Sequence, residues 1–381
     1  MATTYLTLTN NVLNELNESE LTSSTFSSSR GIQTSVKKFV LKAMHEVYNG
    51  LSEIPDLYLS TTQDTNAGQR TYSLPSSASP QSTDKAYRKI DWQTFRLVPK
   101  ELVTNGEFTS DISSWTTIAG SGSAAYNSGG NGRARLNDYA IYQAISTVKN
   151  KTYRIQVRAY DTVGTGQAFK VQVGTSAEDT TNLGTTLTVT NFGEGNILDT
   201  TFTATATTSY VTINNPTTAT NMDVDYVRVS RSDIAPKKLA SITYDTYLQT
   251  NKVADDVNNS SAFGLPAKVI RKPDYGSFIL SPIPGEGEYT VSYDYYTTHT
   301  DLSAHGDTMS LPDRFSPLIV DRSKYYVYML RSDPQHAQLA DRDYQRKLKL
   351  LKTDYGTHSS DYMRTDVVTE SIVTNVGTQV G

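Results

Sequence analysis

Few residues in this sequence have the types and spacing that enzyme chemistry requires. The histidines are scattered, and none forms the His-x-x-x-His pair that binds a metal from one helix face. They are His45, His299, His305, His336 and His358. Two carboxylate pairs, Asp255-Asp256 and Glu286/Glu288, lie in turn-like segments where acids are usually solvated, whereas a retaining glycosidase needs two carboxyls ~5 Å apart in a cleft. The sequence also lacks a Gly-rich phosphate loop and a Gly-x-Ser-x-Gly elbow. These residues predict a protein that is not an enzyme.

The composition narrows the class of protein further. The 381 residues are 37% hydrophobic and 19% charged, which is enough for two or three domains with apolar cores. The formal net charge of −4 argues against a protein that coats nucleic acid, because such a surface would be basic. There is no cysteine, which excludes disulfides and thiolate metal sites. The sequence shows neither a signal-peptide pattern nor an apolar run near ~20 residues, so we expect synthesis in a cytoplasm without classical secretion or a membrane span.

The residue pattern between positions 100 and 232 differs from the pattern before and after it. Residues 88–97 are typical of a strand, and residues 238–244 resume in the same style. We therefore predict a β domain inserted at 100–232 into a host that is formed by residues 1–99 and 233–356. The two strands that flank the insertion should then be neighbours in a sheet of the host.

Apolar residues at helical spacing predict four helices in the host, over residues 5–17, 29–50, 313–332 and 335–354. Asp333-Pro334 separates the last two, because a proline ring cannot fit inside a continuing helix. Residues 357–381 show no helical period, and we expect them to form an extended tail that orders on binding.

The last predicted helix ends in a cluster of bases. These are Arg346, Lys347, Lys349 and Lys352. Cations in the last turns of a helix complement its dipole. The same cations would also suit the acidic surface of a partner protein, so they are a candidate partner interface. Both interpretations remain open.

Short runs of β-branched and aromatic residues fill the rest of the host. They predict strands at 55–61, 69–74, 88–97, 239–250, 276–280 and 289–296, with another that starts within 263–270. Helices at both ends of the host with strands between them indicate an α+β fold, with a helical bundle and a small antiparallel sheet.

The order of these host pieces resembles the head-to-tail adaptor proteins of tailed phages, above all tail tubular protein A of short-tailed phages (podoviruses). The similar segments are residues 8–18, 263–266, 280–284, the strand into Tyr295-Tyr296, residues 311–315 and the helix with Asp333-Pro334. The resemblance implies a virion protein of the tail or neck, which forms a homo-oligomeric ring, usually of twelve subunits, under the portal protein. The other face of such a ring receives a nozzle protein of the tail tubular protein B type, with tail fibres as further neighbours. Double-stranded DNA passes through its lumen without sequence recognition during genome ejection.

Strand patterns recur at regular intervals within the insertion. They lie at 139–146, 151–160, 167–173, 184–190, 199–206, 208–214 and 222–230. Tyr153, Ile155 and Val157 alternate with Arg154 and Gln156, which places one apolar face inward. Several short strands at this spacing predict an all-β sandwich.

The two ends of the insertion resemble the jelly-roll carbohydrate-binding modules. Asn105-Gly106-x-Phe108 opens it, Trp115 follows, and acids precede a hydrophobic-x-hydrophobic run in 222–230. That family commonly holds a structural calcium near its chain ends.

Matched onto this sequence, the resemblance implies Glu107 and Asp225 as ligands of a structural Ca²⁺, with Asp223 as a weaker choice. Carboxylates are the hard oxygen ligands that calcium prefers. The alternative is that these acids cap turns or face water.

Sugar binding in such modules needs an exposed aromatic platform. The aromatic side chains available are Trp115, Tyr126, Tyr139, Tyr142 and Tyr160. We take Tyr126 and Tyr139 as the candidate glycan contacts, and expect Trp115 to lie in the core. The leading hypothesis is thus a structural adaptor with a decorating sandwich. The alternative is a carbohydrate-binding tail or receptor-recognition protein that contacts a host glycan.

Overall fold

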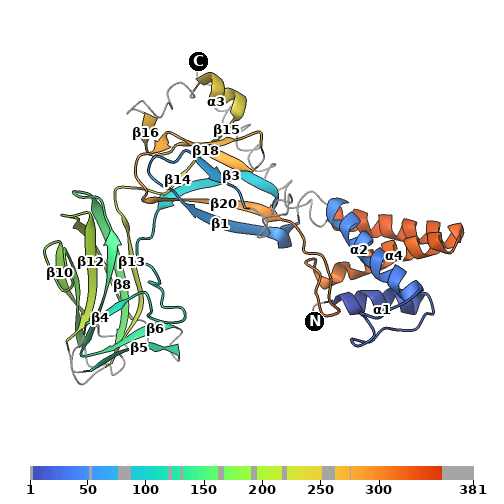
Figure 1. Cartoon of the computed structure of the whole chain (residues 1–381), viewed down its shortest axis with the longest axis horizontal. Coiled ribbons are helices and arrows are strands. Elements are labelled where there is room, and N and C mark those ends of the chain that lie inside the picture. The colour runs from blue at the N-terminus through green and yellow to red at the C-terminus, as the bar shows by residue number, and fades with distance from the viewer. Residues whose placement is uncertain are drawn as a thin grey trace, which may run out of the picture. The chain divides into compact units, whose positions relative to one another are not determined.

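The computed structural model describes residues 3–50, 54–75, 87–118, 122–128, 132–161, 167–189, 195–216, 221–250, 262–274 and 276–353. The chain forms two compact units (Figure 1). The first comprises Met1–Ser60, Pro75–Asp91 and Asp294–Gly381, and the second comprises Thr61–Leu74 and Trp92–Tyr293. The limits expected for the insertion, 100 and 232, fall inside the second unit. The predicted tail 357–381 and the pair Asp255-Asp256 lie outside the described residues.

Both ends of the chain contribute helices to the first unit. They are α1 (Tyr5–Glu15), α2 (Ile32–Gly50), α4 (Ser316–Leu330), which follows the 3-10 turn η4 (Asp313–Phe315), and a helix over residues 334–353. The four predicted helices are therefore present, within a few residues of their expected bounds. No helix in the described residues is long and apolar enough to cross a membrane.

The apolar stripes of these helices meet in one core. Val12 of α1, Val40 of α2, and Ile319 and Val327 of α4 are fully buried, and Leu351 is nearly so. Burying each such side chain stabilises the fold by about 1.5–3 kcal/mol. Packing of amphipathic faces, more than helix propensity, thus holds the unit together.

A charged network also lies between these helices. Arg322 of α4 pairs with Glu46 of α2 and, at 2.7 Å, with Asp341 of the next helix. The hydroxyl of Tyr326 also donates to Glu46. Burial alone would raise the pKa of Glu46, but the hydrogen bonds from Arg322 and Tyr326 outweigh it and hold the pKa below its usual value.

Ten strands of the second unit form two five-stranded sheets. They are β4 (Thr116–Ile118), β5 (Ser123–Asn127), β6 (Arg133–Asn137), β7 (Tyr139–Ser146), β8 (Thr152–Asp161), β9 (Gln167–Gly174), β10 (Leu183–Val189), β11 (Asn196–Thr203), β12 (Thr208–Asn215) and β13 (Met222–Arg231). The sheet orders are β10-β9-β12-β7-β4 and β11-β8-β13-β6-β5. The seven predicted strands are confirmed. Sequence analysis missed β4, β5 and β6, which are only three to five residues long.

The core of these two sheets is a sandwich interior. Tyr153, Ile155 and Val157 of β8 are fully buried, while Arg154 and Gln156 between them point outward. The alternation read from the sequence is thus confirmed. Side chains from both sheets share one core, which includes Phe169, Val171, Val211 and Val227.

Three further sheets complete the described strands. One has the order β1-β20-β3-β14, from β1 (Tyr58–Asp64), β20 (Tyr289–Thr297), β3 (Tyr87–Pro99) and β14 (Lys237–Lys238). Another has the order β15-β17-β18-β2, from β15 (Ala240–Thr243), β17 (Lys268–Arg271), β18 (Ser277–Ser281) and β2 (Thr71–Ser73). The third pairs β16 (Phe263–Gly264) with β19 (Ile283–Pro284). The expectation of one small antiparallel sheet is corrected, since β15 pairs with β17 in parallel and β16 with β19 likewise.

Two of the predicted host strands differ from their expected bounds: one is shifted by three residues and the other is shorter. Residues 55–57 form a 3-10 turn, η1 (Pro55–Leu57), before β1 begins. The predicted strand 239–250 ends at Thr243, and α3 (Tyr244–Thr250) follows. Tyr244, Tyr247 and Leu248 share one face at helical spacing and pack together, with Ile270 beneath them, so tertiary packing overrides the β propensity of the tyrosines.

The chain leaves β3 and returns in β14 at adjacent positions. Lys237 pairs with Leu97 and Lys238 with Arg96, so the expected pairing is present at the start of the second flanking strand, whereas β15 continues into another sheet and pairs with β17. Between these points the backbone N–H of Leu102 donates to the carbonyl of Val229 at 2.9 Å. The chain therefore enters and leaves the sandwich side by side.

A buried ionic network lies at this junction. The side chain of Arg231, at the end of β13, is 3% exposed and pairs with Asp233, Glu286 and Glu288. The hydroxyl of Tyr153 in the sandwich donates to Glu288 at 2.6 Å. Burial alone would lower the pKa of Arg231, but the three carboxylates outweigh it and raise the pKa. The expectation that Glu286 and Glu288 are solvated turn acids is wrong for Glu288, which is 7% exposed.

Candidate functional site

The helix over residues 334–353 presents its basic end to solvent. The stripe that packs inward is Ala337, Ala340, Tyr344, Leu348 and Leu351. Arg346, Lys349 and Lys352 are exposed, as are Leu339 and Leu350, at 48% and 62%. Arg346 follows Leu339 by seven residues, about two helical turns, and Leu350 follows Arg346 by four residues, about one turn. The three side chains therefore lie on one side of the helix. We call these three residues the outer face.

The outer face has the chemistry of a protein-binding surface. Large apolar side chains beside an arginine are typical of interfaces, where arginine and apolar anchors are enriched. Met329 and Leu330 at the end of α4 are also more than half exposed. The helical unit thus presents several large apolar side chains that its own core does not use.

Lys347 differs from the other predicted interface cations. Its Nζ pairs with Asp321 of α4, whose side chain is only 6% exposed and also pairs with Lys324 at 3.0 Å. This lysine therefore holds two helices of the unit together. Of the four bases, Lys347 thus forms an ion pair inside the unit, and the other three are exposed to solvent.

The two predicted calcium ligands each face arginine. Glu107 accepts a hydrogen bond from Arg228 at 2.6 Å. Asp225 lies 3.4 Å from Arg133 and 3.6 Å from Arg158. The guanidinium groups contact oxygens that a calcium ion would need, so the geometry lends the calcium interpretation no support and it stays a prediction.

Asp223, the weaker choice, is held more tightly. Its carboxylate receives two hydrogen bonds from Arg135, at 2.7 and 2.9 Å, and one from Asn127 at 2.9 Å. The hydrogen bond to Asp223 raises the pKa of Arg135. A bidentate pair of this kind links the neighbouring strands β6 and β13, in which Arg135 and Asp223 are directly opposite each other.

The predicted aromatic contacts do not form a flat exposed platform. Trp115 is 5% exposed and packs in the core, as expected. Tyr126 and Tyr139 are half-buried, and the hydroxyl of Tyr126 donates to the carbonyl of Thr109 at 3.0 Å. Tyr160 is buried beneath Arg133.

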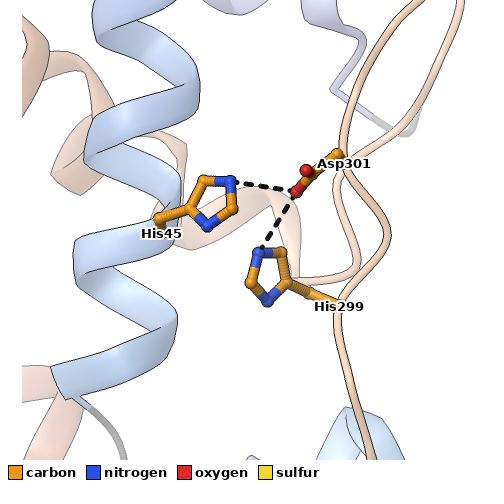
Figure 2. A group of neighbouring side chains, drawn as sticks. All are labelled: His45, His299 and Asp301. Atoms are coloured by element: carbon orange, nitrogen blue, oxygen red, sulfur yellow. Dashed lines mark ion pairs between the residues drawn. The ribbon is translucent and has the colours of Figure 1, made fainter. Parts of the chain in front are cut away.

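Three side chains that sequence analysis left apart meet in the first unit. His45 comes from α2, whereas His299 and Asp301 follow β20. Figure 2 shows both imidazole rings directed at the carboxylate of Asp301. Oδ1 of Asp301 lies 3.0 Å from Nε2 of His45 and 3.5 Å from Nε2 of His299. The expectation that the histidines are scattered is therefore wrong for this pair. The His-Thr-Asp spacing of 299–301 was a signal, because residues i and i+2 of an extended chain point the same way.

Comparison with known structures finds similarity to carbohydrate-binding modules over about a third of the chain. A structure described as "CBM4 structure and function" is 17% identical, with 34% of this chain and 99% of the other covered and a TM-score of 0.29. The xylan-binding CBM22-1 domain of Paenibacillus barcinonensis Xyn10C is 11% identical, with 36% and 98% covered and a TM-score of 0.29. The N-terminal cellulose-binding domain of Cellulomonas fimi β-1,4-glucanase C is 16% identical, with 34% and 97% covered and a TM-score of 0.28. No curated protein matches the chain.

One protein-family model matches the sequence directly. It is described as SU10 adaptor protein, and it matches residues 173–368. This range is just over half of the 381 residues, and it contains α4 and the helix with the outer face. The chain therefore belongs to the SU10 adaptor protein family.

Proposed function

We propose that this protein is a structural adaptor in the virion of a tailed phage, where it joins the portal protein to the tail nozzle. The observation that supports this most is membership of the SU10 adaptor protein family over residues 173–368. The resemblance of the host pieces to head-to-tail adaptors agrees with it. In this proposal the role is structural and involves no catalysis, and the protein is assembled into the neck of the particle in the cytoplasm of a bacterial host.

The proposed assembly is a ring of identical subunits, with twelve as the expected number. Double-stranded DNA passes through its lumen without sequence recognition. A net charge of −4 suits this role, because a strongly basic lumen would bind the phosphate backbone and hold the genome. The inserted sandwich, proposed as a jelly roll, decorates the ring.

The outer face is the proposed contact of the helical unit with the neighbouring virion protein. Leu339 and Leu350 would enter apolar pockets of the partner, and Arg346 between them would pair with a partner carboxylate. Residues 357–381 are proposed to add an extended segment to the same contact.

Imaging of purified virions tests the assignment. A ring of this protein between portal and nozzle is expected in averaged cryo-electron microscopy images, and a virion without such a ring would refute the proposal. The contact is tested with Leu339→Ser/Leu350→Ser, which should abolish attachment of the recombinant protein to tailless heads. Ile197→Ser, which changes another side chain that is 55% exposed, is the matched control and should attach normally.

A second candidate function is carbohydrate binding by the sandwich. The rings of Tyr142 and Tyr210 lie 5.9 Å apart on neighbouring strands β7 and β12. The same sheet carries a hollow of about 350 Å³, lined by Lys170, Gln172 and Thr185 among others. A glycan array tests this candidate through saturable binding of the unaltered chain. Loss of binding in Tyr142→Ala/Tyr210→Ala, with binding kept in Tyr126→Ala/Tyr139→Ala, would place the sugar on the sheet that carries Tyr142 and Tyr210. Loss in the second variant alone would favour the contacts predicted from the sequence.

A further inference from the structure

We infer that His45, His299 and Asp301 form a binding site for a divalent transition-metal ion, with Zn²⁺ as the best match. Each of the three offers one ligand atom, and these atoms all lie within 4.8 Å of one another. Among the described residues, no other group of three or more His, Cys, Asp or Glu side chains brings its ligand atoms this close together. The inference is independent of the adaptor function.

Two of the three ligand-atom distances agree with those in a tetrahedral site, and the third is no longer than 4.8 Å. Zinc binds imidazole nitrogen and carboxylate oxygen at about 2.0–2.2 Å, so two ligand atoms of a tetrahedron are about 3.3 Å apart. Nε2 of His45 and Nε2 of His299 lie 3.0 and 3.5 Å from Oδ1 of Asp301, on either side of that value. A bound ion would bring the two ring nitrogens to a similar separation.

The surroundings hold the ligands in place. The ring of His299 stacks on the buried Tyr48, with 4.3 Å between centroids and 5° between planes. The ring of His45 meets the ring of His299 edge-on at 4.8 Å. Because the rings are already restricted before a metal binds, binding costs less conformational entropy.

One side of the group remains open. The side chain of His299 is 16% exposed, whereas those of His45 and Asp301 are 44% and 64% exposed. Three protein ligands with solvent access leave a fourth position for water or for a ligand from another molecule. Two imidazoles and one carboxylate select zinc, cobalt or nickel over calcium and magnesium, which prefer an all-oxygen shell.

A bound metal would join two distant parts of the chain. His45 belongs to α2, and His299 and Asp301 belong to the segment after β20. A metal that binds the folded unit more tightly than the unfolded chain stabilises the fold. At a free Zn²⁺ concentration 100 times Kd, the melting temperature should rise by on the order of 5 °C.

Titration of the full-length chain without a histidine tag, with Co²⁺ and then Zn²⁺, tests the site. Four-coordinate Co²⁺ gives intense visible absorption, and Zn²⁺ should abolish it by displacement. We expect one ion per chain. Asp301→Asn and His45→Gln should each weaken binding by at least about 100-fold, since even outer-shell changes cost 10–100-fold.

His336→Gln is the matched control, because His336 lies 2.6 Å from Asp333 in an exposed His–Asp pair that is not part of such a group. It should bind as the unaltered protein does. Because Asp301 is largely exposed, Asp301→Asn should fold normally, and circular dichroism checks this. Absence of Co²⁺ absorption in the unaltered chain would overturn the inference. So would equal binding by folded Asp301→Asn.

Discussion

The core of the sandwich is built from apolar side chains, whereas in the helical unit ion pairs lie between the helices. Arg154 and Asp199 pair on an outer surface where both are more than a third exposed. Asp321 pairs with Lys347 while only 6% exposed. A sandwich made from one continuous stretch of chain closes its core mostly with apolar side chains, although Asp223 and Arg231 of β13 are also buried. A unit assembled from the two ends of the chain uses buried ion pairs to fix which helix meets which. Four predictions test this difference.

The largest effect is expected from a cavity in the sandwich. Phe169→Ala removes a fully buried ring and should lower the free energy of unfolding by about 3–5 kcal/mol. Denaturant unfolding followed by the fluorescence of Trp115, which lies in the same core, measures it. Ile197→Ala, at an exposed position, is the control and should change stability by less than about 0.5 kcal/mol. Equal losses in both variants would contradict a close-packed interior.

The junction of the sandwich should respond next. Arg231→Met leaves the buried Glu288 without its cation and should cost about 3 kcal/mol. Adding Glu288→Gln should restore part of that loss, because the unpaired buried charge is removed. The exposed pair gives the comparison, since Arg154→Met should cost less than about 1 kcal/mol. A similar cost for both arginines would show that burial of the network is unimportant.

The internal ion pair of the helical unit should have a smaller effect. Asp321→Asn should lower stability by about 2 kcal/mol, the range for hydrogen bonds to charged groups. Lys347→Gln tests the same contact from the other helix. Chemical denaturation of both single variants and the double variant forms a cycle, in which the double loss should be smaller than the sum. Additive losses would mean that the two groups do not interact.

At neutral pH the smallest effect is expected from Tyr5→Phe. Burial raises the pKa of Tyr5 to about 12, and burial with the hydrogen bond to Glu46 raises the pKa of Tyr326 to about 12. A tyrosine whose pKa is higher in the folded state stabilises the fold fully below about pH 10, which is its pKa in the unfolded chain. This stabilisation is lost as the pH rises toward 12. Helical circular dichroism at increasing pH should show this loss, and Tyr5→Phe should reduce it. Tyr126→Phe in the sandwich should leave the helical profile unchanged.

Local periodicity predicted most of the elements. Alternation around Ile155 and Val157 gave the strand β8 and its buried face, and the helical stripe through Val40 gave α2. It failed where packing against distant residues decides the conformation. Tyr244 and Tyr247 have high β propensity, yet they form α3 because they pack over Ile270.

The candidate sites were harder to predict, because pairing between distant residues leaves little local trace. The sequence showed that Glu107 and Asp225 are acidic, but not that Arg228 and Arg133 would face them. It placed Glu288 in a turn without revealing the buried Arg231 beside it. His45 and His299 lie in separate elements, so only the fold could bring them together.

The adjacent pairing of β3 and β14 has a consequence for engineering this protein. Because the chain departs and returns at neighbouring positions, the sandwich can be treated as an exchangeable cassette, and another domain whose ends lie close together could be grafted between Leu97 and Lys237. Any such graft would remove Arg231 and leave Glu288 facing a foreign surface. A successful exchange therefore needs Glu288→Gln in the host, or an incoming domain that carries its own arginine at that place.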